Sequence, residues 1–492
     1  MSYITDYTTP DGFNLKLQTG LFINNEFVGG SETIDVLDPS TEKLITSVQA
    51  GGAEEIDLAV KAAHEAFHNV WRYTSAQKRG KLLYKLAELV ERDADELAHI
   101  EALDIGKPLA TARSFDVAMI PEYMRYYAGW CDKIHGKVVD TEGTLTYIRH
   151  EPFGVCGGII PWNVPLIMFA MKVAPALATG NVIVIKPSEI GPLSSIKMAA
   201  LIKEAGFPPG VVNVVTGYGA TAGDALARHP LVRKIAFTGS GAVGRLVMKA
   251  AAETNLKKVT LELGGKSPNI FFDDISDLDK AVSWAYKAIY MNAGQICLAG
   301  SRIYVQEGIY DKFLEKFKQL VLAAKVGSPW DDGVIQGPQI SQKQMERVLE
   351  YIDVGKKEGA TCLLGGNRHG NQGYFIEPTV FTDVSPDMRI MKEEIFGPVA
   401  AISKFNDIDE VVKEANDTEY GLAAGVFTSN VKTAIEVSNK LESGAVWVNH
   451  YLSADVYAPF GGYKQSGIGR ENSEYSLQEY YQIKTVKINL KN

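Results

Sequence analysis

Short apolar segments alternate with helical segments between residues 154 and 261, and this alternation limits the fold more than any other feature of the sequence. The apolar segments are expected to be strands, at Gly154–Ile160, Val182–Ile185, Val211–Val215, Lys234–Phe237 and Val259–Leu261. The segments between them have helical character, at Ile167–Leu177, Ser194–Ala205, Ala222–Arg228 and Val243–Glu253. Apolar strands that alternate with helices predict an α/β fold with a parallel sheet covered on both faces.

A second alternation of strands and helices follows from Asn269 to Trp447, with helices expected near Tyr310–Ala324, Lys343–Lys357 and Ile408–Ala415. The first 50 residues have the pattern of strands and turns, and amphipathic helices are expected near residues 56–67, 82–90 and 112–134. Two extended segments remain, at Thr144–Arg149 and Tyr481–Leu490. The terminal segment needs a sheet edge, in its own subunit or in a neighbour.

The composition excludes several classes of function. With 492 residues the chain can hold two or three domains. A net charge of −9 provides no basic surface for nucleic acid or an anionic membrane, and no apolar run reaches the roughly 18–20 residues that span a bilayer. The first residues lack the features of a secretory signal, and the four cysteines form no C-x-x-C pair, so we expect a cytoplasmic protein with reduced thiols. The eight histidines show no metal-ligand spacing, so no metal is expected.

Two glycine-rich segments each present one reactive side chain, Glu262 within Val259–Lys266 and Cys297 within Asn292–Arg302. Glycines beside a functional side chain let backbone and ligand approach closely. A thiol and a carboxylate can trap a carbonyl covalently and then activate water to release it. Each residue also has an ordinary interpretation, because most free cysteines are small buried hydrophobes and many glutamates in apolar surroundings are salt-bridged or cap a helix.

A G-x-G-x-x-G sequence, Gly239–Gly244, follows a predicted strand and opens a predicted helix, which is the context of a dinucleotide-binding turn. Such a turn is ordinarily followed about 20 residues later by an acidic residue on the ribose, and Glu262 occupies that position. Lys186 and Glu189 form a second candidate, since a lysine and a glutamate at a strand end can also bind ribose hydroxyls. The spacing does not decide between these hypotheses, and Lys186 and Glu189 also fit a solvated pair at a strand end.

The chain resembles the aldehyde dehydrogenase superfamily over nearly its whole length. Seven motifs occur in the family's order, at residues 160–163, 186–189, 237–240, 261–266, 294–297, 393–398 and 459–467. The likeness is greatest to the NAD-dependent enzymes that oxidise aliphatic or retinoid aldehydes. It implies a Rossmann-like parallel-sheet cofactor domain, a second α/β catalytic domain and a small β extension for oligomerisation. We expect the dinucleotide-binding domain at 1–129 and 153–264, the catalytic domain at 265–464, and the oligomerisation segments at 130–152 and 465–492.

By this resemblance, Cys297 is the nucleophile, Glu262 is the general base, and the Asn163 amide forms the oxyanion hole with the Cys297 backbone N–H. The resemblance implies that NAD, and NADP more weakly, is bound by Ile160, Trp162, Lys186, Glu189, Gly239, Ser240, Val243, Glu394 and Phe396. It implies a substrate tunnel lined by Val164, Met168, Met171, Met291, Ala454, Tyr457 and Phe460. The chain departs from the family at Gly241, where threonine is usual, and we expect a more flexible turn there that still binds the cofactor.

The expected reaction is aldehyde + NAD⁺ + water → carboxylic acid + NADH, through a thiohemiacetal and a thioester on Cys297. Three alternatives remain: a CoA-acylating enzyme, a non-catalytic ligand-binding relative, and a cysteine hydrolase that pairs Cys297 with a histidine. Glu262 favours hydrolysis over CoA transfer, because a carboxylate base suits the water route. The expected partners are a small aldehyde and a second copy of the chain, in a homodimer or homotetramer.

Overall fold

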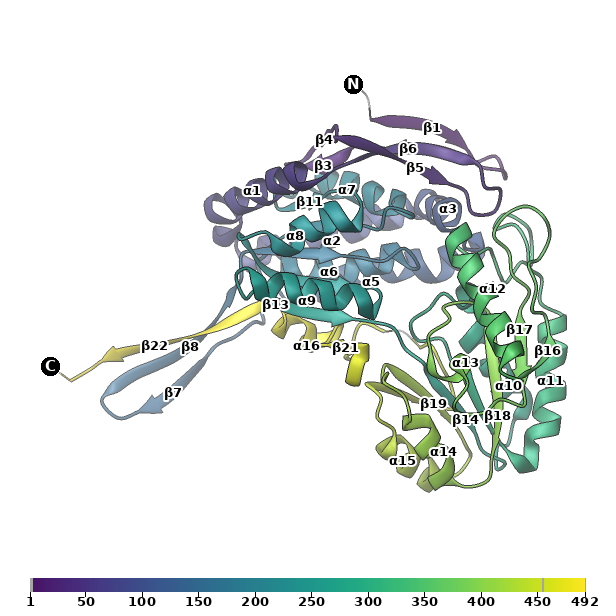
Figure 1. The fold of residues 1–492 in the computed structure, drawn as a ribbon. Helices are drawn as coiled ribbons and strands as arrows, with labels where there is room; N and C mark the ends of the chain where they lie inside the picture. Colours follow the sequence, from purple (N-terminus) through teal and green to yellow (C-terminus); the bar gives the residue numbers. More distant parts are fainter. Residues whose placement is uncertain (1–2, 454, 492) are drawn as a thin grey trace.

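An eight-stranded sheet forms the centre of the computed structural model, which describes residues 3–453 and 455–491. Its strand order is β21-β13-β12-β9-β10-β11-β3-β4 (Figure 1). The five central strands are β9 (Val155–Ile159), β10 (Val182–Lys186), β11 (Val212–Val214), β12 (Val232–Thr238) and β13 (Lys258–Glu262). These five run parallel, as the alternation predicted. The remaining strands pair antiparallel, and they are β3 (Leu21–Ile23), β4 (Glu26–Val28) and β21 (Gly467–Ile468).

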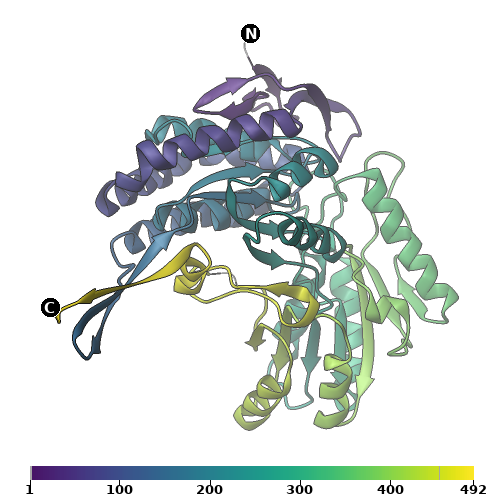
Figure 2. The same ribbon diagram turned by 60° about the vertical axis from the view of Figure 1, so that its left-hand side comes forward.

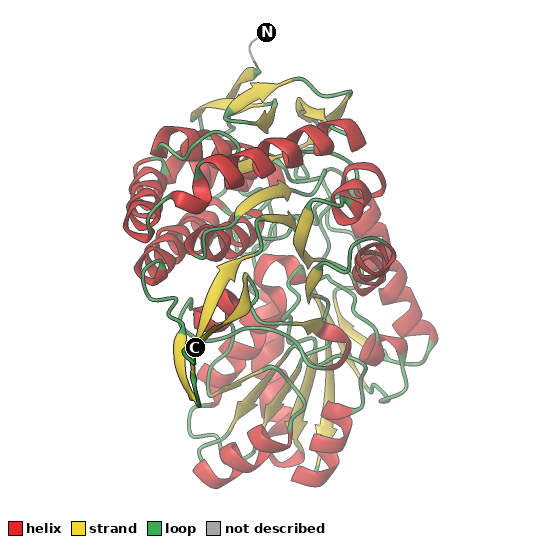
Figure 3. Cartoon of the chain, turned by 90° about the vertical axis from the view of Figure 1, so that its left-hand side faces the viewer, coloured by secondary structure: helices red, strands yellow, loops and turns green. Residues whose placement is uncertain are grey.

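Helices cover both faces of this sheet (Figure 3). They are α1 (Ala53–Asn69), α2 (Ala76–Arg92), α3 (Ala94–Ile105), α5 (Ala118–Trp130), α6 (Pro165–Ala178), α7 (Leu193–Ala205), α8 (Asp224–Arg228) and α9 (Gly241–Glu253). Helix α6 is the most enclosed of those that reach the site. Pro165 opens it, where a missing N–H costs nothing, and every residue except Met168 is buried. Packing on both sides therefore fixes α6, and Met168 remains free to face a ligand.

The second α/β unit contains a seven-stranded sheet with the order β16-β17-β18-β15-β14-β19-β20. The strands are β14 (Pro268–Phe271), β15 (Arg302–Gln306), β16 (Thr361–Leu364), β17 (Thr379–Thr382), β18 (Val399–Phe405), β19 (Ala423–Phe427) and β20 (Ala445–Val448). All are parallel except β16. The accompanying helices are α10 (Leu278–Tyr290), α11 (Tyr310–Leu322), α12 (Gln342–Lys357), α13 (Arg389–Lys392), α14 (Ile408–Asn416) and α15 (Val431–Lys440). This unit lies below the first in Figure 1.

A three-stranded antiparallel sheet projects from the body of the molecule (Figure 2). It consists of β7 (Lys137–Thr141), β8 (Thr144–Pro152) and β22 (Tyr481–Asn489). The short helix α16 (Ser473–Gln478) precedes β22 in the chain. The terminal strand thus finds its sheet edge on β8 of its own chain. The arm still exposes apolar side chains, among them Val138 and Ile483. Two small hairpins, β1 (Ile4–Thr8) with β2 (Asn14–Gln18) and β5 (Glu32–Leu37) with β6 (Leu44–Ala50), complete the N-terminal region.

The helix expected over 112–134 is not a regular α-helix throughout. It begins with a π-helical turn, Ala112–Val117, and α5 then ends at Trp130. A π-helical turn inserts a residue into the helical repeat, so the apolar periodicity alone could not locate it. No helix within residues 3–453 and 455–491 is long and apolar enough to cross a membrane.

The strand order determines where a ligand can bind. From β9 the chain adds β10 and β11 on one side, and then β12 and β13 on the other side. The helices after β9 and β12 therefore leave the sheet in opposite directions, and a crevice opens beyond the carboxyl ends of these two strands. Asn163 follows β9, Gly239 follows β12, and Glu262 is the last residue of β13.

Candidate active site

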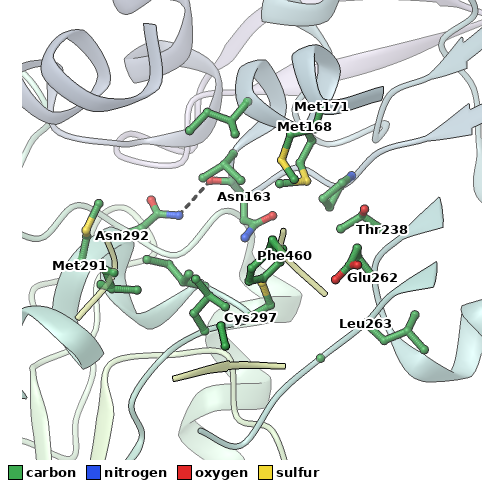
Figure 4. A pocket seen from close by; sticks show the side chains of 18 of the residues that line it. Asn163, Met168, Met171, Thr238, Glu262, Leu263, Met291, Asn292, Cys297 and Phe460 are labelled. Atoms are coloured by element: carbon green, nitrogen blue, oxygen red, sulfur yellow. Dashed lines mark hydrogen bonds between the residues drawn. The ribbon is translucent and has the colours of Figure 1, made fainter. Parts of the chain in front are cut away.

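A cavity of about 500 Å³ lies beyond this crevice, between the first sheet and the loop that precedes β15. It collects most of the residues expected to act on substrate and cofactor (Figure 4). Those that line it are Cys297, Glu262, Asn163, Trp162, Gly239, Ser240, Glu394, Phe396, Val164, Met168, Met171, Met291 and Phe460. Residues predicted from six separate stretches of sequence therefore surround one space.

Other expected residues lie outside this cavity. Ile160 is buried and does not line the cavity, and Val243 is exposed on α9. Tyr457, expected in the tunnel, is 66% exposed and packs its ring against Tyr126. Ala454, expected beside it, lies outside the described residues. Of the described residues in this part of the chain, those that line the cavity are Leu452, Ser453, Asp455, Ala458, Pro459 and Phe460.

Lys186 and Glu189 lie apart from the cavity, at the carboxyl end of β10. Lys186 Nζ is 2.8 Å from Glu189 Oε2, and the lysine is buried whereas the glutamate is partly exposed. Burial lowers the pKa of Lys186, and the nearby carboxylate opposes that shift. The pair has the geometry of a fixed hydrogen-bonding site at a strand end of the parallel sheet.

Cys297 follows a sharp turn at the end of α10. The turn is a short 3₁₀ segment, Met291–Gly294, and it directs the next residues into the cavity. Cys297 as a whole residue is partly exposed. Burial of the thiol, followed by the charges of Glu394 and Glu262, raises the pKa of Cys297 to about 12. The thiol is therefore protonated at neutral pH in the free protein, and its activation requires a base or a nearby positive charge.

Asn163 binds the nucleophile loop directly. Its Nδ2 donates to the backbone oxygen of Gln295, 2.8 Å away and two residues before Cys297. An amide NH₂ has two hydrogens, so one N–H of Asn163 remains for a ligand. The side chain is buried at the cavity wall, where a hydrogen bond is stronger than in water. The arrangement can stabilise an oxyanion that forms next to Cys297.

Glu262 faces the cavity from the end of β13, paired in register with Thr238 of β12. Its Oε2 has no hydrogen-bond partner among the described residues. Burial, and then the charge of Glu471, raises the pKa of Glu262 well above its usual value. Glycine at position 461 leaves room for the Glu262 side chain, because a Cβ there would lie 2.9 Å from Glu262 Oε1. A buried carboxylate with a raised pKa is a stronger base than an exposed one.

Glu394 reaches the same cavity from the second unit. Its Oε1 accepts a hydrogen bond from the Gly265 N–H at 3.0 Å, and burial raises its pKa to about 7. Gly264 lies so close to this carboxylate that a Cβ would overlap it. The Phe396 ring meets the Trp162 ring edge-on at 5.4 Å. Gly264 thus allows close packing against Glu394, whereas a Cβ at Gly265 would meet the Cys297 backbone oxygen.

The family model described as "Aldehyde dehydrogenase family" matches residues 27–486. The chain belongs to the aldehyde dehydrogenase family. Aldehyde dehydrogenases from Agaricus bisporus and Emericella nidulans are 56% and 58% identical to it, over 96% of this chain and 96% and 95% of theirs. A solved structure described as an NAD⁺ complex of aldehyde dehydrogenase from Bacillus cereus has a TM-score of 0.95 and 48% identity, covering 96% of this chain and 97% of that chain. This aldehyde dehydrogenase is therefore an enzyme and an oxidoreductase.

The turn between β12 and α9 of this aldehyde dehydrogenase explains its departure at Gly241. Ser240 caps α9, with its Oγ accepting from the Val243 N–H. A Cβ at Gly241 would meet only the end of the Arg245 side chain, at 3.5 Å. The space around position 241 would therefore also accept a larger residue. The Ser240 cap is the contact that holds the turn. Gly239 differs, because a Cβ there would press on the Phe237 ring.

Sequence reasoning missed several residues of the aldehyde dehydrogenase site. The cavity is also lined by Lys107, Phe115, Met119, Tyr123, Ile167, Thr238, Asn292, Leu298, Arg347, Trp447, Leu452 and Asn472. The apolar ones among them that lie in helices, Phe115, Met119, Tyr123 and Ile167, follow an apolar periodicity that predicts only burial. Asn292 carried a usable signal, because Asn-Ala-Gly ahead of a reactive cysteine is a sequence typical of a turn. In the described part of the chain, no group of three or more His, Cys, Asp or Glu residues is placed to hold a metal ion.

Proposed function

We propose that this protein oxidises an aldehyde to its carboxylic acid with NAD⁺ as the hydride acceptor, through a thioester on Cys297. One observation carries the proposal: a thiol, an amide donor and a buried carboxylate, Cys297, Asn163 and Glu262, line one cavity at the crevice of a doubly wound sheet. The membership of the aldehyde dehydrogenase family supports the reaction class. The solved relatives described as NAD⁺ complexes support the cofactor.

The residues present fit a dinucleotide. Thr238 Oγ1 is buried without a hydrogen-bond partner among the described residues, and Gly239 and Ser240 turn the chain into α9 at the switch point. We assign Lys186 and Glu189 to the adenosine ribose, with Ile160 and Val243 around the same end, and Trp162 to the cofactor beside Phe396. Glu394 and Phe396 take the nicotinamide end, inside the cavity. When bound, NAD⁺ supplies the hydride acceptor, and NADP is a weaker alternative.

The proposed chemistry begins at Cys297. The thiol loses its proton to a water molecule, and its thiolate sulfur attacks the aldehyde carbon. The free N–H of Asn163 and the Cys297 backbone N–H stabilise the charge on oxygen, an effect of a few kcal/mol for such donors. After the hydride has left, a thioester joins the acyl group to Cys297. Glu262 then removes a proton from water, which attacks the thioester and releases the acid.

Burial supports these roles in different ways. It raises the pKa of Glu262 well above the usual value, so the carboxylate binds a proton more strongly than an exposed one. It raises the pKa of Cys297 to about 12, so the thiol stays protonated, and less prone to oxidation, until a cofactor or substrate enters. Lys186 and Glu189 can bind the ribose without Glu262, which leaves Glu262 available as the base. This division favours catalysis over ribose binding for Glu262.

We propose that the substrate is a medium-chain or aromatic aldehyde. Met168, Met171 and Met291 line the cavity with Val164. Methionine is flexible and polarisable, so such a wall can adapt to an apolar chain. Each buried CH₂ contributes about 0.8 kcal/mol to binding, which favours longer substrates that still fit.

Three organisational features complete the proposal. The cofactor domain comprises 1–129 and 153–264, the catalytic domain 265–464, and the oligomerisation segments 130–152 and 465–492. The exposed apolar side chains on β7 and β22 support assembly into a homodimer or homotetramer. A mouse relative named "Aldehyde dehydrogenase, cytosolic 1" is 51% identical over 97% of this chain and 96% of its own length, which supports a cytoplasmic location.

Absorbance of NADH at 340 nm, with NAD⁺ and a panel of aldehydes, tests the proposal. We expect NADH formation with a carboxylic acid as product, and no NADH from Cys297→Ala. The Cys362→Ala variant is the matched control, because Cys362 is also partly exposed but lies outside the cavity. Formation of acyl-CoA on adding CoA would instead identify a CoA-acylating enzyme. Absence of NADH with every aldehyde would contradict the proposal.

A further inference from the structure

Three consecutive residues before the nucleophile have left-handed backbone angles. The φ values are 52° at Asn292, 54° at Ala293 and 72° at Gly294. Glycine adopts this conformation freely and asparagine tolerates it. For other L-residues it costs roughly 1–2 kcal/mol. A chain keeps such angles only where its surroundings impose them, and they concentrate at functional sites.

Hydrogen bonds to its carbonyl oxygens, from Gln339 and from the capping residue Gln295, hold the turn in this shape. Gln339 Nε2 donates to the Ala293 carbonyl at 3.0 Å. The Gln295 backbone N–H and its Nε2 both donate to the Asn292 carbonyl, at 3.0 and 3.1 Å. Gly294 packs against the Gly397 backbone so closely that a Cβ would overlap it. The strained turn is therefore fixed on every side.

The Asn292 side chain connects this turn to Asn163. Its Nδ2 donates to the Asn163 backbone oxygen at 2.9 Å and to the Gln295 backbone oxygen at 3.3 Å. Asn163 in turn donates its own Nδ2 to the same Gln295 oxygen at 2.8 Å. Figure 4 shows Asn292 directed at the Asn163 backbone, with Cys297 in the same cavity wall. Asn163, Asn292 and Gln295 form a closed ring of hydrogen bonds.

We propose that Asn292 is a positioning residue, which acts through Asn163 to hold the Asn163 amide in register with Cys297. The inference rests on the proposed function, because it concerns the nucleophile and oxyanion donor assigned there. Asn163 follows β9 of the first sheet, whereas Asn292 lies in the 3₁₀ turn that follows α10 of the second unit. The ring therefore sets the position of one unit's donor relative to the other unit's nucleophile. Alignment of this kind matters because a displacement of about 1 Å can cost 10²-fold in rate.

Asparagine meets both requirements of this position. It accepts the left-handed angle, and its NH₂ supplies two donors to two carbonyl oxygens. Glycine would keep the angle and lose both hydrogen bonds. Aspartate would keep the size and the angle but would direct a carboxylate oxygen at the two carbonyl oxygens. Both substitutions therefore remove the two hydrogen bonds while they keep the backbone angle.

The experiment compares Asn292→Gly with Asn25→Gly in the full-length enzyme, with NAD⁺ and an accepted aldehyde. Asn25 is the matched control: its φ is 63°, its exposed fraction of 8% equals that of Asn292, and its Nδ2 donates to the Phe207 carbonyl at 2.8 Å. It lies outside the cavity lining. We expect kcat to fall about 100-fold in Asn292→Gly, with KM for the aldehyde within about twofold. Asn25→Gly keeps the native kcat.

A double-mutant cycle with Asn163→Ala tests whether Asn292 acts through Asn163. If it does, Asn292→Gly lowers kcat further by less than about threefold once Asn163 is already alanine. Fully multiplicative losses would overturn the inference, as would a native kcat in Asn292→Gly. If the glycine variant does not fold, Asn292→Asp is expected to show the same loss of kcat, and a native kcat there overturns the inference equally.

Cys297→Ala separates this inference from the proposed function. If Cys297→Ala still forms NADH at the native rate, the proposed function fails, and the inference fails with it. If Cys297→Ala is inactive while Asn292→Gly keeps its full kcat, the proposed function stands and only the positioning role of Asn292 is overturned.

Discussion

Lys186 and Glu189 form an ion pair of 2.8 Å at the carboxyl end of β10, with the lysine 3% and the glutamate 30% exposed. The buried ammonium anchors the carboxylate at the place proposed for the adenosine ribose. A carboxylate there accepts from the 2′-hydroxyl of NAD but repels the 2′-phosphate of NADP.

This pair predicts a preference for NAD over NADP in kcat/KM. Replacing Glu189 by Gln removes the negative charge. We therefore expect the ratio of kcat/KM with NAD to kcat/KM with NADP to fall by about tenfold, which corresponds to ~1.4 kcal/mol. Initial rates of NADH and NADPH formation measure it. Equal kcat/KM values for the two cofactors in the native enzyme would contradict this role of Glu189.

Glu394 predicts the pH dependence of Cys297 reactivity. Its pKa is raised to about 7, so it is neutral at pH 6 and charged at pH 9, where its charge disfavours the thiolate. Alkylation of Cys297 by iodoacetamide in Glu394→Gln should therefore be about 3–10-fold faster than in the native enzyme at pH 9, and unchanged at pH 6.

Glu393→Gln provides the control for this measurement. Glu393 is adjacent in sequence, but Arg389 and Tyr351 hydrogen-bond its carboxylate and lower its pKa to about 2. It is not part of the cavity lining, so its removal should leave the alkylation profile unchanged. An acceleration that is equal at pH 6 and pH 9 in Glu394→Gln would show that the charge of Glu394 is not the cause.

The methionine-lined cavity predicts the response to substrate length. Three further methylenes contribute about 2.4 kcal/mol, or roughly fiftyfold in kcat/KM, if the cavity admits them. Met168→Trp should fill the space and abolish that gain, whereas Met248→Trp, on the exposed side of α9, should not. Measuring kcat/KM from two-carbon to eight-carbon aldehydes tests this. A steady fall with chain length would show a narrower tunnel.

The projecting β-arm predicts the assembly state. Removing residues 483–492 takes away most of β22, with the exposed Ile483 and Ile488. We expect light scattering to show a smaller species than the native dimer or tetramer, because the edge and its apolar side chains are lost. Circular dichroism provides the control for an intact fold. An unchanged mass would exclude the C-terminal strand from the interface.

The parallel sheets and most of the site could be predicted from sequence. Glu262 and Lys186 each end an apolar strand, and the carboxyl ends of parallel strands meet at one sheet edge. The spacing left the role of Glu262 open, because a ribose-binding acid and a general base can occupy the same strand end. The cavity next to Cys297 provides the argument that the spacing lacked.

Other features depended on tertiary contacts that no local pattern records. The hydrogen bond between Asn163 and Asn292 joins residues 129 positions apart, and the left-handed turn is imposed by neighbours such as Gln339. Tyr457 fitted the expected tunnel by position, yet its ring packs against Tyr126 at the surface. Contacts between residues far apart in the sequence determine the hydrogen bond, the turn and the position of the Tyr457 ring.

The central claim, a thioester on Cys297 hydrolysed through Glu262, is tested most directly by intact-mass measurement of Glu262→Gln. This variant is mixed with NAD⁺ and an accepted aldehyde and quenched in acid within one turnover. We predict one NADH per subunit and an acyl mass increment that maps to Cys297 and is absent from the Cys297→Ala/Glu262→Gln double variant. Native steady-state turnover of Glu262→Gln, with no acyl increment, would contradict the account and return Glu262 to a role in ribose binding.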